Sequence, residues 1–104
     1  MGLRNFLLRR HHYVWDRMAA VSTQYIGDLP YGLAKRADLA RALAGEPKLL
    51  LLDEPAAGLT EGERVTVGEI VRKLVERRMT VVLIEHDMTF VTKVCDRLLV
   101  LTQG

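Results

Sequence analysis

The sequence has little of several features that define whole classes of proteins. It contains one cysteine, Cys95, so no disulfide can form within the chain, which fits a reducing compartment. Its longest aliphatic runs, such as residues 49–52 and 81–84, are four residues, against about 20 in a membrane-spanning helix. Fifteen basic and 13 acidic residues leave a net charge of +2, too small to favour a nucleic-acid partner. We therefore expect a cytoplasmic protein that reaches a membrane only through a partner.

The overall composition is that of an ordinary globular protein. Hydrophobic residues make up 49% and charged residues 27% of the 104 positions, which excludes disorder and low complexity. A chain of this length buries about two-thirds of its unfolded surface, so it can form one domain with a modest core.

The first clear helix and strand follow each other after residue 32. Residues 33–44 are rich in Ala, Leu, Arg and Lys, which favour helix, and Gly45 and Pro47 then stop it. Residues 48–52 are apolar at nearly every position, which is typical of a strand covered on both faces in a parallel sheet.

The same alternation continues to the end of the chain. Thr60 and Glu63 have capping-box spacing, and a helix beyond them places its apolar residues on one face at Val67, Ile70, Val71 and Leu74. Residues 81–85 predict a second buried strand, Asp87 predicts the cap of a short helix to Val94, and residues 97–101 predict a third strand. Residues 1–28 predict a helical lead-in. The order of elements predicts an α/β layered sheet.

Polar side chains follow both central strands of the predicted sheet. Asp53 and Glu54 come directly after the leucine run, and Glu85, His86 and Asp87 follow the next strand. In open parallel sheets ligands bind beyond the carboxyl ends of the strands, so these groups are expected at one edge. A single acidic pair at a strand end is more often an ordinary surface feature. Carboxylates that follow four leucines on a rigid strand argue against that interpretation.

Several motifs in this half of the chain together resemble those of ATP-binding cassette (ABC) proteins. Residues 49–55, Leu-Leu-Leu-Leu-Asp-Glu-Pro, resemble the Walker B strand, and residues 56–59 lie where the D-loop belongs. Residues 29–32, Leu-Pro-Tyr-Gly, with the helix after them, resemble the signature motif, and His86 resembles the switch histidine. The resemblance covers about residues 29–104 and is greatest for ATP-binding subunits of branched-chain amino acid importers. It implies a partial P-loop NTPase-type parallel sheet with flanking helices that lacks the N-terminal half, with residues 1–28 as a remnant of the helical subdomain.

The resemblance also implies a role for each motif residue. Asp53 would hold Mg²⁺, Glu54 would act as general base toward the attacking water, and His86 would contact the γ-phosphate of ATP. Gly58 would allow the tight backbone of the D-loop. The nucleotide of a second ATP-binding subunit would be contacted by the signature segment, which comprises Leu29, Pro30, Tyr31 and Gly32.

Two departures from the family pattern affect these roles. Pro30 stands where the signature usually has serine, and proline offers neither a hydroxyl nor an amide donor. The phosphate-binding Walker A loop, Gly-x-x-x-x-Gly-Lys-Ser/Thr, is missing from the sequence. Gly27 and Gly32 have the right spacing, but Leu33 and Ala34 follow them. We therefore expect the chain alone not to hydrolyse ATP, and we expect poor solubility, because its strands need the rest of a cassette to cover them.

Three functions follow from these observations. The first is part of an ABC transporter ATPase, with membrane permease subunits and a second ATP-binding subunit as partners, on the cytoplasmic face of the plasma membrane. The second is a non-catalytic interaction module that docks to a permease or to a full cassette. The third, a cassette ATPase of DNA repair or translation, has no support from the charge distribution.

Overall fold

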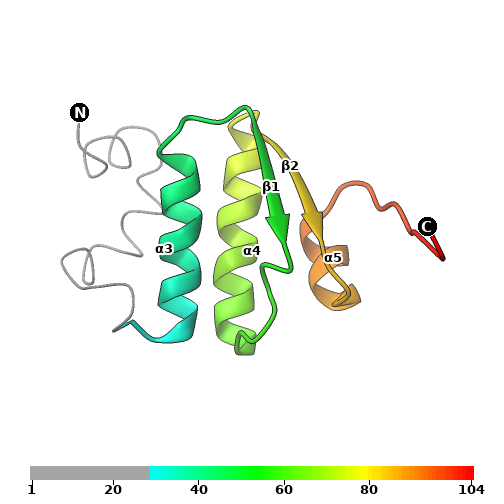
Figure 1. Ribbon diagram of the computed structural model, residues 1–104, viewed down its shortest axis with the longest axis horizontal. Coiled ribbons are helices and arrows are strands. Elements are labelled where there is room, and N and C mark those ends of the chain that lie inside the picture. The colour runs from blue at the N-terminus through cyan, green and yellow to red at the C-terminus, as the bar shows by residue number, and fades with distance from the viewer. Residues whose placement is uncertain (1–28) are drawn as a thin grey trace.

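The computed structural model describes residues 29–104, and the predicted helical lead-in over residues 1–28 lies outside this part of the chain. Its elements follow in the order α3 (Tyr31–Leu43), β1 (Leu49–Asp53), α4 (Glu61–Glu76), β2 (Thr80–Ile84) and α5 (Met88–Val94) (Figure 1). The two strands pair in parallel, with Leu49 opposite Thr80 and Asp53 opposite Ile84. This is the predicted α/β architecture, and the central elements lie within two residues of their predicted positions.

Local capping signals fix the starts of two helices. The Thr60 hydroxyl accepts a hydrogen bond from the Glu63 amide at 3.2 Å, and the Glu63 carboxylate accepts one from the Thr60 amide at 2.8 Å. The Asp87 carboxylate accepts a hydrogen bond from the Phe90 amide at 3.1 Å and caps α5. Both predicted caps are therefore confirmed, and each satisfies backbone donors that a helix start leaves unpaired.

Helix α4 forms the centre of the hydrophobic core, because its buried side chains take part in two clusters. One cluster joins α3 and β1 to the second half of α4, and its buried members are Leu39, Ala40, Leu43, Leu50, Ile70 and Leu74. The other joins the loop after β1 and helix α5 to the middle of α4, and its members are Ala56, Leu59, Val67, Val71, Phe90 and Val94. Leu52 and Val81, on the inward face of the strands, pack against both clusters.

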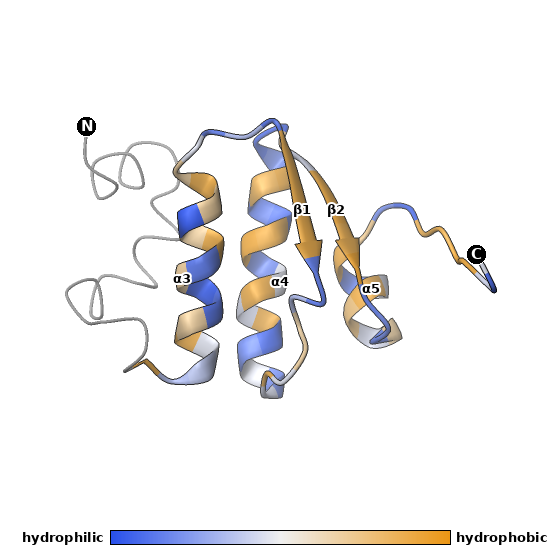
Figure 2. Cartoon of the chain, in the orientation of Figure 1, coloured by the Kyte–Doolittle hydropathy of each residue, from blue (hydrophilic) through white to orange (hydrophobic). Residues whose placement is uncertain are grey.

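The other face of the sheet is bare in the part of the chain that the structure describes. The exposed side chains of this bare sheet face alternate along the strands, and they are Leu49, Leu51, Val82 and Ile84. Figure 2 shows that both strands are hydrophobic along their length. The prediction that the leucine strand is covered on both faces is therefore not met within residues 29–104, where the helices pack against one face only.

The predicted third strand over residues 97–101 is wrong. These residues form no strand and extend away from the sheet (Figure 1), with Leu99 82% exposed. An apolar run becomes a strand only when a neighbouring strand accepts its hydrogen bonds, and the described sheet consists of β1 and β2 alone. Among residues 29–104, no helix has the length and hydrophobicity needed to span a membrane.

Candidate functional site

The carboxyl ends of β1 and β2 lie together at one edge of the sheet, as the parallel pairing requires. The Glu54 amide donates a hydrogen bond to the Ile84 carbonyl at 2.8 Å, so the strand ladder continues one residue beyond β1. We call Asp53, Glu54 and His86, which follow one another around this edge, the rim. All three residues of the rim are exposed to solvent.

Glu54 and His86 approach each other closely on the rim. One carboxylate oxygen of Glu54 lies 3.4 Å from Nδ1 of His86, and their side chains are 50% and 78% exposed. Glu54 has a positive φ of 48°, a left-handed conformation that costs a residue with a Cβ about 1–2 kcal/mol. Such strain is concentrated at functional sites, where the surrounding structure holds the residue in place.

Asp53 lies one residue earlier, opposite Ile84 in the register, on the bare sheet face. Its carboxylate makes no hydrogen bond or ion pair within residues 29–104 and is exposed to solvent. No group of three or more metal-ligating side chains occurs in this part of the chain. Asp53 thus fits Mg²⁺ in the way nucleotide sites use it, where one or two carboxylates and the phosphates share an ion that keeps several waters. It does not fit a metal site built from protein ligands alone.

The signature segment, residues 29–32, packs against the start of α4 and the loop after β1. A Cβ on Gly32 would overlap the Glu63 carboxylate, so a larger residue there would have to displace the side chain that completes the capping box. A Cβ on Gly58 would lie 2.8 Å from the ring of Tyr31, and Gly58 also has a positive φ of 74°. Pro30 occupies the N-cap of α3 and makes no side-chain cap. The α3 amides at this end are therefore left without a side-chain acceptor from the cap residue.

The predicted site residues thus form two groups. Asp53, Glu54 and His86 share the rim, while Tyr31 and Gly58 meet beside the start of α3, with Leu29, Pro30 and Gly32 in the same segment. Within residues 29–104, no hydrogen bond or ion pair joins the two groups. The roles predicted for the individual residues, and the second subunit that the signature segment would serve, stay predictions.

Sequence reasoning gave no role to Glu85, which the structure places behind the rim. Its side chain is only 1% exposed, although His86 beside it is mostly exposed. Its carboxylate accepts hydrogen bonds from the Ala56 and His86 amides, both at 3.1 Å. The signal that predicts this burial is the alternation of β2: Val81 and Leu83 face inward, and Glu85 continues the same parity.

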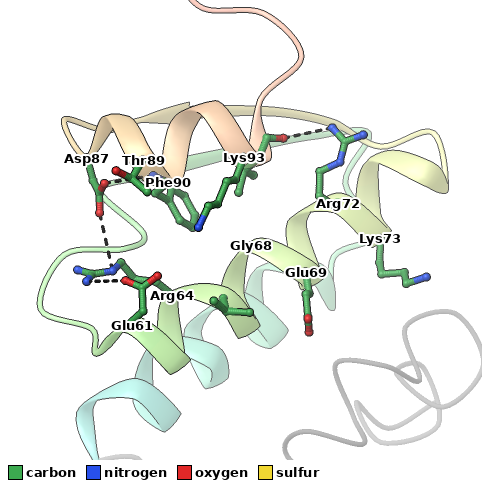
Figure 3. Close-up of a pocket in the computed structure, with 12 residues that line it drawn as sticks. Glu61, Arg64, Gly68, Glu69, Arg72, Lys73, Asp87, Thr89, Phe90 and Lys93 are labelled. Atoms are coloured by element: carbon green, nitrogen blue, oxygen red, sulfur yellow. Dashed lines mark hydrogen bonds and ion pairs between the residues drawn. The ribbon is translucent and has the colours of Figure 1, made fainter.

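A groove of about 310 Å³ lies between α4 and α5, and none of the predicted site residues lines it. Figure 3 shows Phe90 and Gly68 in the groove, with charged side chains around it. Arg64 at one end pairs with Glu61 at 3.0 Å and with Asp87 at 3.8 Å. Arg72 at the other end pairs with Asp96 at 2.8 Å. Both arginines of the groove therefore have acidic partners.

Comparison with proteins of known function gives a consistent group of relatives. BraF of Pseudomonas aeruginosa, a high-affinity branched-chain amino acid transport ATP-binding protein, is 43% identical over 79 residues, which are 75% of this chain and 31% of BraF. The corresponding LivG protein of Escherichia coli is 41% identical over 78 residues, 74% of this chain and 31% of LivG. The Nod factor export ATP-binding protein I of Rhizobium johnstonii is 40% identical over 88 residues, 85% of this chain and 28% of that protein.

The fold comparison points to the same class. The crystal structure of the ADP conformation of MJ1267, an ATP-binding cassette of an ABC transporter, matches with a TM-score of 0.74 and 25% identity. The match covers 88% of this chain and 34% of MJ1267. No family model matches the sequence.

The fold is therefore that of part of an ATP-binding cassette. From sequence and fold together, the chain belongs to the family of ABC transporter ATP-binding proteins, as the motifs predicted. It spans about a third of the length of the curated relatives it matches.

Proposed function

We propose that this chain supplies the hydrolytic edge of an ABC transporter ATPase. The observation that carries the proposal is the 3.4 Å approach of the Glu54 carboxylate to Nδ1 of His86 at the carboxyl end of two parallel strands. Phosphoryl transfer to water needs an oriented water and compensation of phosphate charge more than covalent chemistry. An exposed carboxylate beside an exposed imidazole offers the first of these.

Each rim residue has a different role in this proposal. The Glu54 carboxylate accepts the proton of the attacking water, and its strained backbone keeps it pointing from the sheet edge. His86 orients that water and contacts the terminal phosphate. Asp53 holds Mg²⁺ through one carboxylate, and the ion, when bound, neutralises charge on the phosphate oxygens.

The signature segment serves a second nucleotide in this proposal. Tyr31 and Gly32 present the amides of the first turn of α3, and the N-terminus of a helix favours a phosphate. Leu29 and Pro30 lead into this turn, and the absence of a side chain on Gly58 leaves room for the ring of Tyr31. The nucleotide in question would be held by a second ATP-binding subunit.

The proposal requires a phosphate-binding loop from outside this sequence. The 104 residues contain no Gly-x-x-x-x-Gly-Lys-Ser/Thr motif, and such a loop provides the amides and the lysine that cradle the phosphates. The bare sheet face is the surface against which the rest of a cassette would pack. We infer that the isolated chain does not turn over ATP and that the complete assembly works on the cytoplasmic face of a membrane with permease subunits.

The names of the relatives suggest the transported substrate. BraF and LivG are branched-chain amino acid transport proteins, whereas the rhizobial relative exports Nod factor. Together with the motif resemblance, the first two favour amino-acid uptake for the assembly that contains this chain.

A second candidate function is a non-catalytic docking module. The exposed apolar side chains of the bare sheet face favour it, because such a surface binds a partner whether or not ATP is hydrolysed. On this alternative, the chain binds a permease or a full cassette and the rim is not used.

One experiment separates the two functions. The 104-residue chain is co-purified with an N-terminal cassette half that carries the phosphate loop, and phosphate release is measured. The proposed ATPase gives turnover that Glu54→Gln abolishes. The matched control Glu76→Gln changes a surface carboxylate at the end of α4 and keeps the activity. Stable binding without Glu54-dependent turnover would favour the docking module instead.

A further inference from the structure

Glu85 is a buried carboxylate that joins the two loops of the rim. One of its oxygens accepts a hydrogen bond from the Ala56 amide, and the other accepts one from the His86 amide, each at 3.1 Å. Ala56 lies in the loop after β1 and His86 lies in the loop after β2, so the two bonds connect segments about 30 residues apart in the chain. The same carboxylate lies 3.8 Å from Nδ1 of His86.

Burial of this group needs an explanation, because a carboxylate leaves water at a high cost unless it is paired. No Lys or Arg forms an ion pair with Glu85 in the part of the chain that the structure describes, and His86 is the basic side chain beside it. The cost of burying the Glu85 carboxylate is offset by hydrogen bonds from two backbone amides. Hydrogen bonds to a charged acceptor are stronger than those to a neutral one. An apolar residue would continue the inward face of Val81 and Leu83 without any such requirement.

The two hydrogen bonds of Glu85 hold the backbone on both sides of the rim. Ala56 is two residues after Glu54, and the Ala57 amide bonds back to the Glu54 carbonyl at 3.1 Å, so fixing Ala56 fixes the turn that carries Glu54. The bond to the His86 amide fixes the backbone of the imidazole on the other side. The backbone bond from the Glu54 amide to the Ile84 carbonyl already ties the start of this turn to β2. The Glu85 side chain adds a second link, which joins the rest of the turn to the backbone of His86, while the side chains of Glu54 and His86 are 50% and 78% exposed.

We propose that Glu85 is a positioning residue: its carboxylate anchors the Glu54 loop to the His86 loop and thereby holds the two groups in register. The catalytic consequence of this anchor rests on the proposed function, whereas the anchor itself does not. Glu85 does not touch the nucleotide and takes no proton in this proposal.

The anchor is tested by hydrogen exchange on the full chain, with single-residue resolution by mass spectrometry. We expect the Ala56 and His86 amides to be protected in the parent protein. In Glu85→Gln, which keeps the volume, the amide group retains one acceptor oxygen and turns its NH₂ toward the other donor. At least one of the two amides should then exchange about tenfold faster, which corresponds to about 1.4 kcal/mol. Glu76→Gln, the exposed control, should leave both amides unchanged.

The catalytic consequence is tested in the co-purified assembly described above. Glu85→Gln should lower kcat by about 10–100-fold, the scale expected when a reacting group is displaced by about 1 Å. It should leave KM for ATP within about twofold, because binding depends on other residues. A residue that merely stabilises the fold would lower the active fraction without changing exchange specifically at Ala56 and His86.

The outcomes distinguish the anchor from the proposed function. Unprotected Ala56 and His86 amides in the parent protein overturn the anchor, and this measurement does not depend on any variant folding. Unchanged exchange in Glu85→Gln overturns it as well. Faster exchange with unchanged kcat, in an assembly that Glu54→Gln inactivates, overturns the positioning role and leaves the proposed function standing. If the parent assembly shows no Glu54-dependent turnover, the proposed function fails while the exchange result still decides the anchor.

Discussion

The same substitution, glycine to alanine, should have opposite effects at two positions only four residues apart. Gly58 has a positive φ of 74°, and a Cβ there would lie 2.8 Å from the Tyr31 ring. Gly62 lies in the first turn of α4, and a Cβ there would meet nothing within 4 Å. These two positions therefore separate backbone strain and crowding from intrinsic helix propensity.

The expected magnitudes follow from these contacts. Gly58→Ala forces a left-handed conformation on alanine, which costs about 1–2 kcal/mol, and it must also displace the Tyr31 ring, which costs up to about 1 kcal/mol more. Gly62→Ala removes the entropic penalty of glycine in a helix and should stabilise by about 0.5–1 kcal/mol. The two variants should thus differ in unfolding free energy by roughly 1.5–4 kcal/mol.

Urea denaturation followed by far-ultraviolet circular dichroism measures both variants on the 104-residue chain. A change in midpoint with an unchanged slope reports stability directly. In a Tyr31→Ala background, the cost of Gly58→Ala should fall only by the part that the ring contributes. Equal stability of Gly58→Ala and the parent protein, or destabilisation by Gly62→Ala, would refute the reasoning.

Three further predictions concern the cap, the thiol and the bare sheet face. Asp87→Ala should destabilise the chain by about 1 kcal/mol because it removes the α5 cap, whereas Asp87→Asn, which keeps an acceptor, should cost much less in the same urea titration. Burial raises the pKa of the Cys95 thiol, with a further increase from Asp96 and a smaller opposing effect of Arg72. Alkylation of Cys95 should therefore have its pH midpoint higher in the folded chain than in urea, and a lower midpoint would contradict this. Leu51→Lys places a charge on the bare sheet face and should reduce self-association in sedimentation velocity, whereas a parent protein that sediments as a sharp monomer with a cooperative melt would contradict the expectation.

Elements with strong local signals could be predicted from the sequence. The Thr60–Glu63 capping box and the Asp87 cap depend on residues three apart, so the sequence contains the whole interaction. The rim was predictable for a different reason: parallel strands bring their carboxyl ends together, which determines that Glu54 and His86 meet.

Features that depend on a distant partner could not be predicted in the same way. Residues 97–101 have the composition of a strand, but composition does not supply the neighbouring strand that accepts their hydrogen bonds. The inward direction of Glu85 follows from the alternation of β2, but its hydrogen bond to the Ala56 amide, 29 residues away in the chain, depends on the fold. Motif spacing identifies the histidine beside Glu85 and says nothing about this bond.

If Glu54 acts as proposed, its left-handed backbone makes stability and turnover of the assembly compete at a single position. Glycine adopts this conformation freely, so Glu54→Gly should relax the turn by about 1 kcal/mol while removing the group assigned to the attacking water. A screen for variants of this chain with higher thermal stability alone would therefore favour loss of the Glu54 carboxylate. Any such screen needs an activity measurement alongside it to keep the acidic side chain in place.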